Sequence, residues 1–289
     1  MQPVECGGKG MKLGWSANET SVRMLRIAKI AALLFLVGYA LLYWFEPFSD
    51  LWNTILSNLF LVTASSFAAV IATMIWTRYH ASDAPRRVWS PFAMGLWLWA
   101  TAEFIWGFLN VTQGEVPEGP ADVFWIVSYV FFGQALLAQY QIVVRPTGRE
   151  LWSRIAIALL ALLGLYLLIF GALSPASGGA SRFDAAINSF YPAADLLLAL
   201  VALWLTRNFS GGAFARPWLG LLAFAFADLL YAWIEISGLY SWSVDQANWL
   251  STLTDIAYLG AYLVLGFGIL SQWAFLTYGL RSPTVPRET

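Results

Sequence analysis

Long apolar stretches separated by short polar segments run along almost the whole chain. Eight of them are long enough to cross the roughly 30 Å hydrocarbon core of a membrane as helices. They cover residues 28–45, 54–77, 90–111, 122–145, 152–173, 185–206, 216–237 and 250–276. Residues 1–22 are polar, without the apolar core of a signal peptide, and the first stretch ends without a small-residue cleavage site, which favours an uncleaved anchor. The pattern predicts an all-α polytopic membrane protein with eight transmembrane helices.

The composition agrees with this class. Of the 289 residues 59% are hydrophobic, 17% aromatic and only 11% charged, and the mean hydropathy is +0.64. A soluble domain carries roughly 25% charged residues. The net charge of −1 offers no basic face for nucleic acid.

The rarest residues exclude several kinds of site. Cys6 is the only cysteine and His80 the only histidine, so an intrachain disulfide, a Cys-rich metal site and a multi-histidine centre are ruled out. The three lysines, Lys9, Lys12 and Lys29, all fall before or at the start of the first span, which excludes a retinal Schiff base in a late helix. We therefore expect no cofactor.

Charge in the connecting segments predicts the orientation. Fifteen of the sixteen Lys and Arg residues fall in the N-terminal tail, the even-numbered connections or the C-terminal end, and only Arg182 falls on the other side. Basic loops stay in the cytoplasm, so both termini are expected there, which demands an even number of spans. We expect a multi-pass protein of the plasma (bacterial inner) membrane with short cytoplasmic tails at 1–27 and 277–289.

Similar residues recur in the same order in the two halves of the chain. The matched positions are Glu103 with Asp228, Trp106 with Tyr231, Asp122 with Asp255, Trp125 with Tyr258, and Tyr129 with Tyr262. Ordered agreement across several helices predicts a duplication into four-helix repeats, 28–145 and 152–276. Because each repeat has an even number of spans, the two are expected to lie parallel in the membrane rather than inverted.

Polar and aromatic side chains share one face in five of the predicted helices, at a spacing of three and seven residues. The stripes are Glu103/Trp106/Asn110, Asp122/Trp125/Tyr129, Asn188/Tyr191/Asp195, Asp228/Tyr231/Glu235 and Asp255/Tyr258/Tyr262. In the predicted orientation every one of these acids lies in the outer half of the membrane or at its outer rim. No Lys or Arg is expected at comparable depth to neutralise them.

Three of these acids lie deep in their spans. An ionised acid at the centre of a span costs about 2.5–3.5 kcal/mol, so Glu103, Asp195 and Asp228 together would cost about 8–10 kcal/mol if they faced lipid. They are therefore expected to face the bundle interior or a water-filled cavity, some of them protonated. An acidic cavity lined with Trp and Tyr suits an organic cation, and equally a proton or a hard metal ion. The ligand-binding candidates are Glu103, Trp106, Asp122, Tyr129, Tyr191, Asp195, Asp228, Tyr231, Asp255 and Tyr262.

A purely structural interpretation stands beside this one. Asp122 and Asp255 each lie near the start of an apolar stretch and are candidates for capping a helix N-terminus. Glu235 lies at an outer helix end, where solvation explains it. Glu103, Asp195 and Asp228 would then be protonated carboxyls that hydrogen-bond between helices.

The arrangement of these motifs resembles the multispan N-terminal membrane regions of some bacterial diguanylate cyclases and sensor histidine kinases. The similarity covers about residues 28–276, and its motifs are Ala102-Glu103-x-x-Trp106, Pro117 through Asp122 to Tyr129, Asn188-x-x-Tyr191-Pro192-x-x-Asp195, Ala227-Asp228-x-x-Tyr231 and the trailing Asp255 to Tyr262. The resemblance implies perception of a membrane or extracytoplasmic signal. Since no GGDEF, EAL or kinase domain follows in this sequence, the chain is expected to act through a partner.

Three functions remain open at this point. The first is a ligand-sensing or accessory protein with an outward-facing acidic and aromatic cavity, which contacts a protein partner through cytoplasmic loops. The second is a small transporter or channel for protons or cations, and the third is a structural subunit of a membrane complex. No enzyme is expected, because there is no H-E-x-x-H, phosphate-binding loop or intramembrane aspartyl-protease signature around Asp195 and Asp228.

Overall fold

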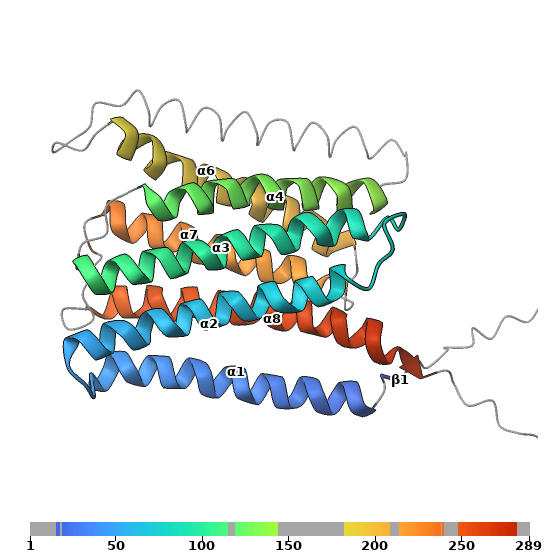
Figure 1. The fold of residues 1–289 in the computed structure, drawn as a ribbon, viewed down its shortest axis with the longest axis horizontal. Helices are drawn as coiled ribbons and strands as arrows, with labels where there is room; N and C mark the ends of the chain where they lie inside the picture. Colours follow the sequence, from blue (N-terminus) through green and yellow to red (C-terminus); the bar gives the residue numbers. More distant parts are fainter. Residues whose placement is uncertain are drawn as a thin grey trace, which may run out of the picture.

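A computed structural model describes residues 16–17, 19–114, 119–143, 182–208, 214–237, 239 and 248–281. This part of the chain forms seven α-helices and one pair of two-residue strands (Figure 1). The helices are α1 (Glu19–Phe45), α2 (Asp50–Trp76), α3 (Arg86–Gln113), α4 (Pro120–Val143), α6 (Arg182–Asn208), α7 (Arg216–Ile236) and α8 (Trp249–Tyr278). The strands are β1 (Ser16–Ala17) and β2 (Leu280–Arg281), which pair antiparallel.

All seven helices are long and apolar enough to cross a membrane. The predicted all-α membrane class is confirmed, and seven of the predicted spans coincide with a helix. The remaining predicted span, 152–173, lies outside the described residues. Helix α1 begins at Glu19, before the expected boundary at residue 28, because polar residues such as Arg23 continue the helix past its apolar part.

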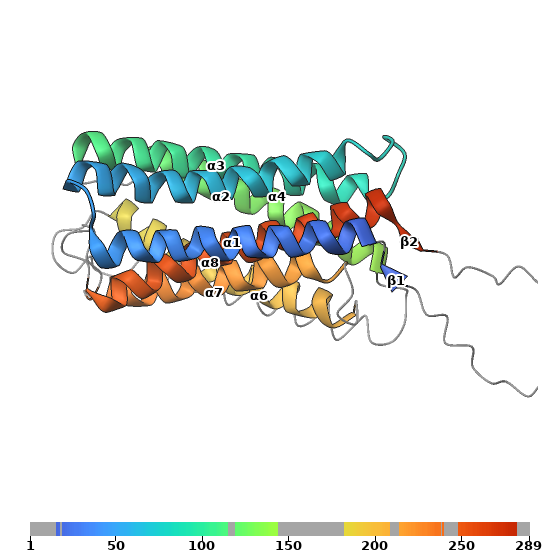
Figure 2. The ribbon, with the colours of Figure 1, turned by 90° about the horizontal axis from the view of Figure 1, so that it is seen from below.

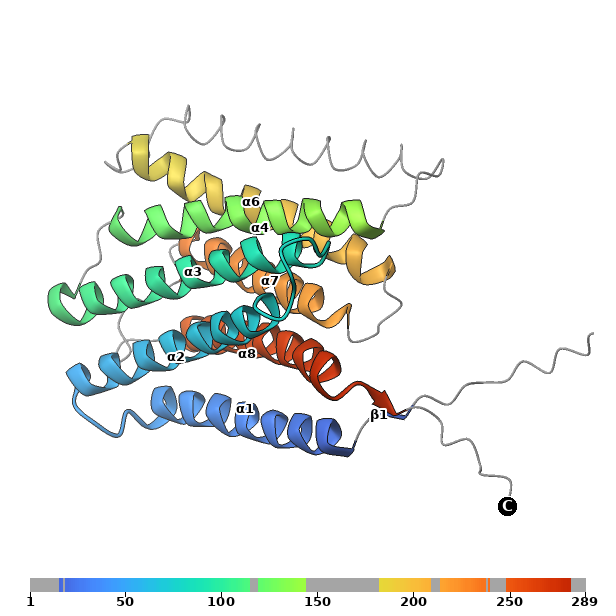
Figure 3. The same cartoon turned by 45° about the vertical axis from the view of Figure 1, so that its right-hand side comes forward.

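The helices pack in two layers. Helix α3 lies between α2 and α4 in one layer, and α7 lies between α6 and α8 in the other. Contacts between α2 and α8 and between α4 and α6 join the layers at their two edges, as the view from below shows (Figure 2). Helix α1 packs against α8 and α2 at one edge of the bundle (Figure 3).

The strand pair defines one end of the bundle, which we name the terminal end; the opposite end is the distal end. Ser16 pairs with Arg281 and Ala17 with Leu280, so the start of α1 and the end of α8 lie together. Helices α2, α4, α6 and α8 run toward the terminal end, and α1, α3 and α7 run away from it (Figure 1).

Aromatic rings fill the space between the layers. Phe92 of α3 lies 5.5 Å from Trp218 of α7, and Trp99 of α3 lies 4.7 Å from Phe224 of α7, as ring-centroid distances. Small residues let neighbouring helices approach closely elsewhere, as expected for helix packing in membranes. The closest approaches join α7 to α8, where Gly220 faces the backbone of Leu265 and Gly268 faces the backbone at Arg216.

We predict that Gly268→Ala destabilises the protein, because the added Cβ would lie 2.5 Å from the Arg216 carbonyl oxygen. Overpacking of this kind costs about 1–3 kcal/mol, and thermal unfolding in detergent, followed by tryptophan fluorescence, measures it. Gly260→Ala is the matched control in the same helix, since no described atom lies within 4 Å of its new Cβ. Equal melting temperatures for the two variants would contradict this packing of α7 on α8.

Candidate functional site

The candidate acids belong to five helices and lie toward the distal end of the bundle. Two of them, Asp122 and Asp255, lie near the starts of α4 and α8. Two more, Glu103 and Asp228, lie in the second halves of α3 and α7. Asp195 lies midway along α6. The alternating helix directions therefore bring these positions to similar depths. Glu103 and Asp195 are buried, with 3% and 1% of their surface exposed, and Asp228 is half-buried.

Glu103 is held by tyrosines from the opposite layer. Its Oε1 accepts a 2.6 Å hydrogen bond from the Tyr262 hydroxyl and a 3.3 Å bond from the Tyr258 hydroxyl, both on α8. The indole rings of Trp99 and Trp125 lie near the same carboxyl, but their N–H groups donate no hydrogen bond to a described residue. Glu103 thus links α3 of one layer to α8 of the other.

Asp195 and Asp228 form a pair of neighbouring carboxyls. Asp195 Oδ1 accepts a 2.6 Å hydrogen bond from the Tyr129 hydroxyl of α4. Asp228 lies near Asp195 and Tyr258, close enough to interact with both electrostatically. The second oxygen of Asp195, Oδ2, is buried and receives a hydrogen bond from no described donor.

These contacts are continuous across the interior. We name Glu103, Asp195, Asp228, Tyr129, Tyr258 and Tyr262 the carboxyl–tyrosine network. Tyrosine hydroxyls donate the hydrogen bonds to Glu103 and Asp195, and Asp228 lies near both of these acids. The expected gathering of the three deep acids is therefore present in the structure, together with tyrosines that hold them.

Asp122 combines a capping role with a contact between layers. Its Oδ2 accepts a 2.7 Å hydrogen bond from the backbone N–H of Gly119, just before α4, with Pro120 as the first helical residue. A side chain that reaches back to the N-cap N–H stabilises a helix start. Its Oδ1 accepts a 2.5 Å bond from the Tyr191 hydroxyl of α6. The capping interpretation of Asp122 is supported, and the residue also joins α4 to α6.

Asp255 does not cap a helix, so that interpretation is wrong. Helix α8 begins at Trp249, and the side chain of Asn248 accepts hydrogen bonds from the N–H groups of Leu250 and Ser251. Asp255 lies farther along the helix, within electrostatic range of the Tyr39 hydroxyl on α1. Asp255 therefore lies near the edge of the bundle that α1 covers.

The remaining candidates lie around the network. Tyr231 is half-buried, with its ring 6.5 Å from that of Tyr258, and Trp106 is half-buried one turn beyond Glu103. The side chains of Asn188 and Glu235 lie outside the described residues. Among the residues that the structure describes, no three acids, histidines or cysteines are placed to hold a metal ion.

Aromatic residues that the stripe pattern did not single out complete the site. The Trp99 ring lies 5.3 Å from that of Tyr129, and the Phe224 ring lies 5.1 Å from Tyr258 and 4.7 Å from Tyr262. The position of Trp99, one helical turn before Glu103, is a signal in the sequence that could have identified it. Phe224 carries no such signal, because it is one of many phenylalanines in an apolar helix.

Comparison of the chain with protein-family models, with curated proteins and with solved structures finds no match. The resemblance to the membrane regions of diguanylate cyclases and sensor kinases therefore stays a prediction.

We predict that Tyr129→Phe destabilises the protein by about 1–3 kcal/mol, because it leaves the buried Asp195 Oδ1 without its donor. Unfolding in mixed detergent micelles measures the change in free energy. Tyr278→Phe is the control, since its hydroxyl makes no hydrogen bond to a described residue while its ring contact with Trp273 is kept. The loss should shrink in an Asp195→Asn background, and a Tyr129→Phe variant as stable as the control would contradict the contact.

Proposed function

We propose that this chain is an integral membrane sensory or accessory protein whose input element is the carboxyl–tyrosine network. The ligand is a cation, and the proton is the cation that the present packing accommodates. One observation carries the proposal: the buried Asp195 Oδ2 accepts no hydrogen bond from a described residue, and the carboxyl of Asp228 is a neighbour of the Asp195 carboxyl.

Hydrogen-bond chemistry favours the proton. A buried carboxyl oxygen without a donor costs free energy, and Tyr129 supplies only one of the two oxygens of Asp195. The carboxyl of Asp228 donates a hydrogen bond only when it carries a proton. One proton shared by the pair therefore satisfies Oδ2, whereas its loss places two negative charges side by side in an apolar interior. The proton site is thus the Asp195–Asp228 pair.

The same contacts offer a route from input to output. The Tyr129–Asp195 bond joins α4 to α6, and the Tyr262–Glu103 bond joins α8 to α3. Adding or removing a proton changes the hydrogen bonds between the two layers, which biases their relative packing. A protein partner at the cytoplasmic loops would read that change.

Orientation and helix count are parts of the proposal. We propose that the terminal end faces the cytoplasm, because the basic residues of the sequence gather in segments at that end. Helix α4 ends at the terminal end and α6 begins at the distal end (Figure 1), which favours the predicted span at 152–173 and a total of eight. The matching contacts of α2 with α8 and of α4 with α6 support two parallel repeats.

We predict that the wild-type protein in lipid nanodiscs at neutral pH shows the infrared C=O stretch of a protonated carboxyl. Asp195→Asn and Asp228→Asn should each reduce this band, because either substitution removes one half of the pair. Asp50→Asn is the control, since Asp50 is an exposed carboxyl in the first turn of α2. A band that is unchanged in both pair variants would contradict a shared proton.

A second experiment separates a sensor from a transporter that would use the same acids as carriers. We expect liposomes that contain the purified protein to show no proton flux beyond that of protein-free liposomes, measured with an enclosed pH-sensitive dye. Flux that Glu103→Gln and Asp228→Asn abolish would replace the sensor proposal with a transporter. An organic cation such as tetramethylammonium could stabilise the wild type but not these variants. In that case the ligand is that cation and not a proton. If neither the infrared band nor the stability changes with pH or with added cations, the protein is a structural subunit.

A further inference from the structure

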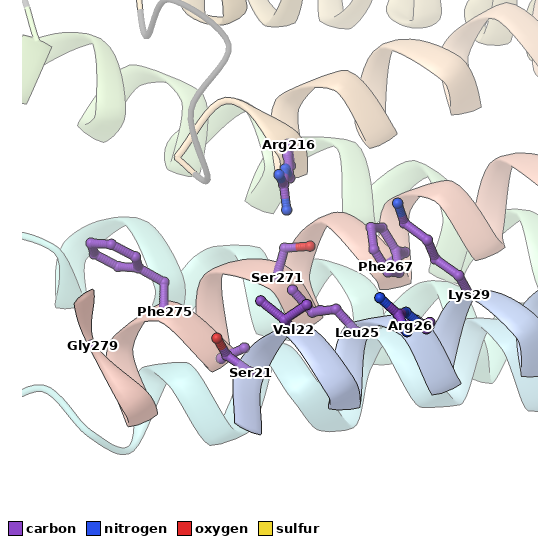
Figure 4. Close-up of a pocket in the computed structure, with 11 residues that line it drawn as sticks. Ser21, Val22, Leu25, Arg26, Lys29, Arg216, Phe267, Ser271, Phe275 and Gly279 are labelled. Atoms are coloured by element: carbon purple, nitrogen blue, oxygen red, sulfur yellow. The ribbon is translucent and has the colours of Figure 1, made fainter. Parts of the chain in front are cut away.

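A cavity of about 490 Å³ lies at the terminal end, far from the network. It is an open pocket lined by the first turns of α1, the start of α7 and the last turns of α8 (Figure 4). Three of its lining residues carry positive charge, namely Arg26, Lys29 and Arg216, and none is acidic. The cavity is therefore an electropositive site that the proposed function does not use.

A buried hydroxyl supplies an independent indication of a ligand. Ser271 of α8 is 2% exposed, and its Oγ has no hydrogen-bond partner among the described residues. Its side chain points toward the space bounded by Arg216, Phe267 and Lys29 (Figure 4). A buried hydroxyl is normally hydrogen-bonded, so this one is suited to donate to an acceptor inside the cavity.

The rest of the lining identifies the acceptor as part of an amphipathic molecule. Val22 and Leu25 of α1 and Phe267 and Phe275 of α8 give the cavity apolar walls, and Val22 is 44% exposed at the outer surface of the bundle. The Lys29 ammonium lies 5.3 Å from the centre of the Phe267 ring, which places a charge at the boundary between polar and apolar walls. A phosphate would meet the arginines and Ser271 while acyl chains lie along the apolar face of α1.

We propose that this cavity binds the phosphate group of an anionic phospholipid. Arg26 and Arg216 donate hydrogen bonds to its oxygens, as guanidinium groups do to phosphates, and Ser271 Oγ donates one more. The first turn of α7 adds the positive end of its helix dipole at Arg216. Basic pockets between transmembrane helices on the cytoplasmic side are suited to such lipids. The lipid would join α1 to α7 and α8 on the side that faces the proposed partner.

The test uses the full-length protein in detergent micelles, with phosphatidylglycerol or phosphatidylcholine added. We expect phosphatidylglycerol to raise the melting temperature and to remain bound in native mass spectra, and phosphatidylcholine to do neither. Arg216→Gln should weaken phosphatidylglycerol binding about tenfold, since a hydrogen bond to a charged group is lost. Arg87→Gln, a change to an exposed cation of α3 outside the cavity, is the control and should leave binding unchanged.

Ser271→Ala separates a lipid contact from a structural role. It removes a hydroxyl that has no partner in the lipid-free protein, so the lipid-free melting temperature should stay the same or rise. The increase caused by phosphatidylglycerol should become smaller. Three outcomes would each overturn the proposal. They are equal stabilisation by both lipids, unchanged phosphatidylglycerol binding in Arg216→Gln and Ser271→Ala, and the same rise in melting temperature with inorganic phosphate alone. None of these outcomes depends on Asp195 or Asp228, so this proposal and the proposed function fail separately.

Discussion

The structure depends on carboxyl groups that are buried between two layers of helices and are held there by tyrosine hydroxyls. A charged carboxylate in an apolar interior is costly unless donors surround it, and the donors to Glu103 and Asp195 come from the layer opposite to each acid. Tyr262 reaches Glu103 across the bundle, and Tyr129 reaches Asp195. The hydrogen bonds that make burial tolerable are therefore the ones that hold the layers together, and any change in the charge of these acids acts on the packing of the whole bundle.

The sequence predicts much of this arrangement, because membrane burial leaves few choices. Apolar length alone predicts seven of the helices, and the cost of placing Glu103 or Asp228 against lipid predicts that they face inward. The pairing of each acid with its tyrosine could not be predicted, since it requires knowing that Glu103 of α3 faces α8 and that Asp195 of α6 faces α4. Helical spacing describes one face of one helix, whereas the choice of neighbour is a property of the assembled bundle.

Two features escaped the sequence analysis for different reasons. Asp255 was expected to be a possible cap, yet Asn248 occupies that position and bonds to the backbone of Ser251. An Asn immediately before the apolar stretch was a visible signal for a helix start. The basic cavity had no visible signal, because Ser271 and Phe267 are ordinary residues of an apolar helix until α1 and α7 are placed beside them.

The short strand pair has a mechanical consequence. Ser16–Ala17 and Leu280–Arg281 lie in register, so the backbone leading into α1 and the backbone leaving α8 are clamped side by side. A pull applied to either end of the described chain is therefore shared between α1 and α8. Because these two segments lie side by side, a short linker can join residue 16 to residue 281. A circular permutant with this linker and new ends in the turn between α1 and α2 should keep the bundle.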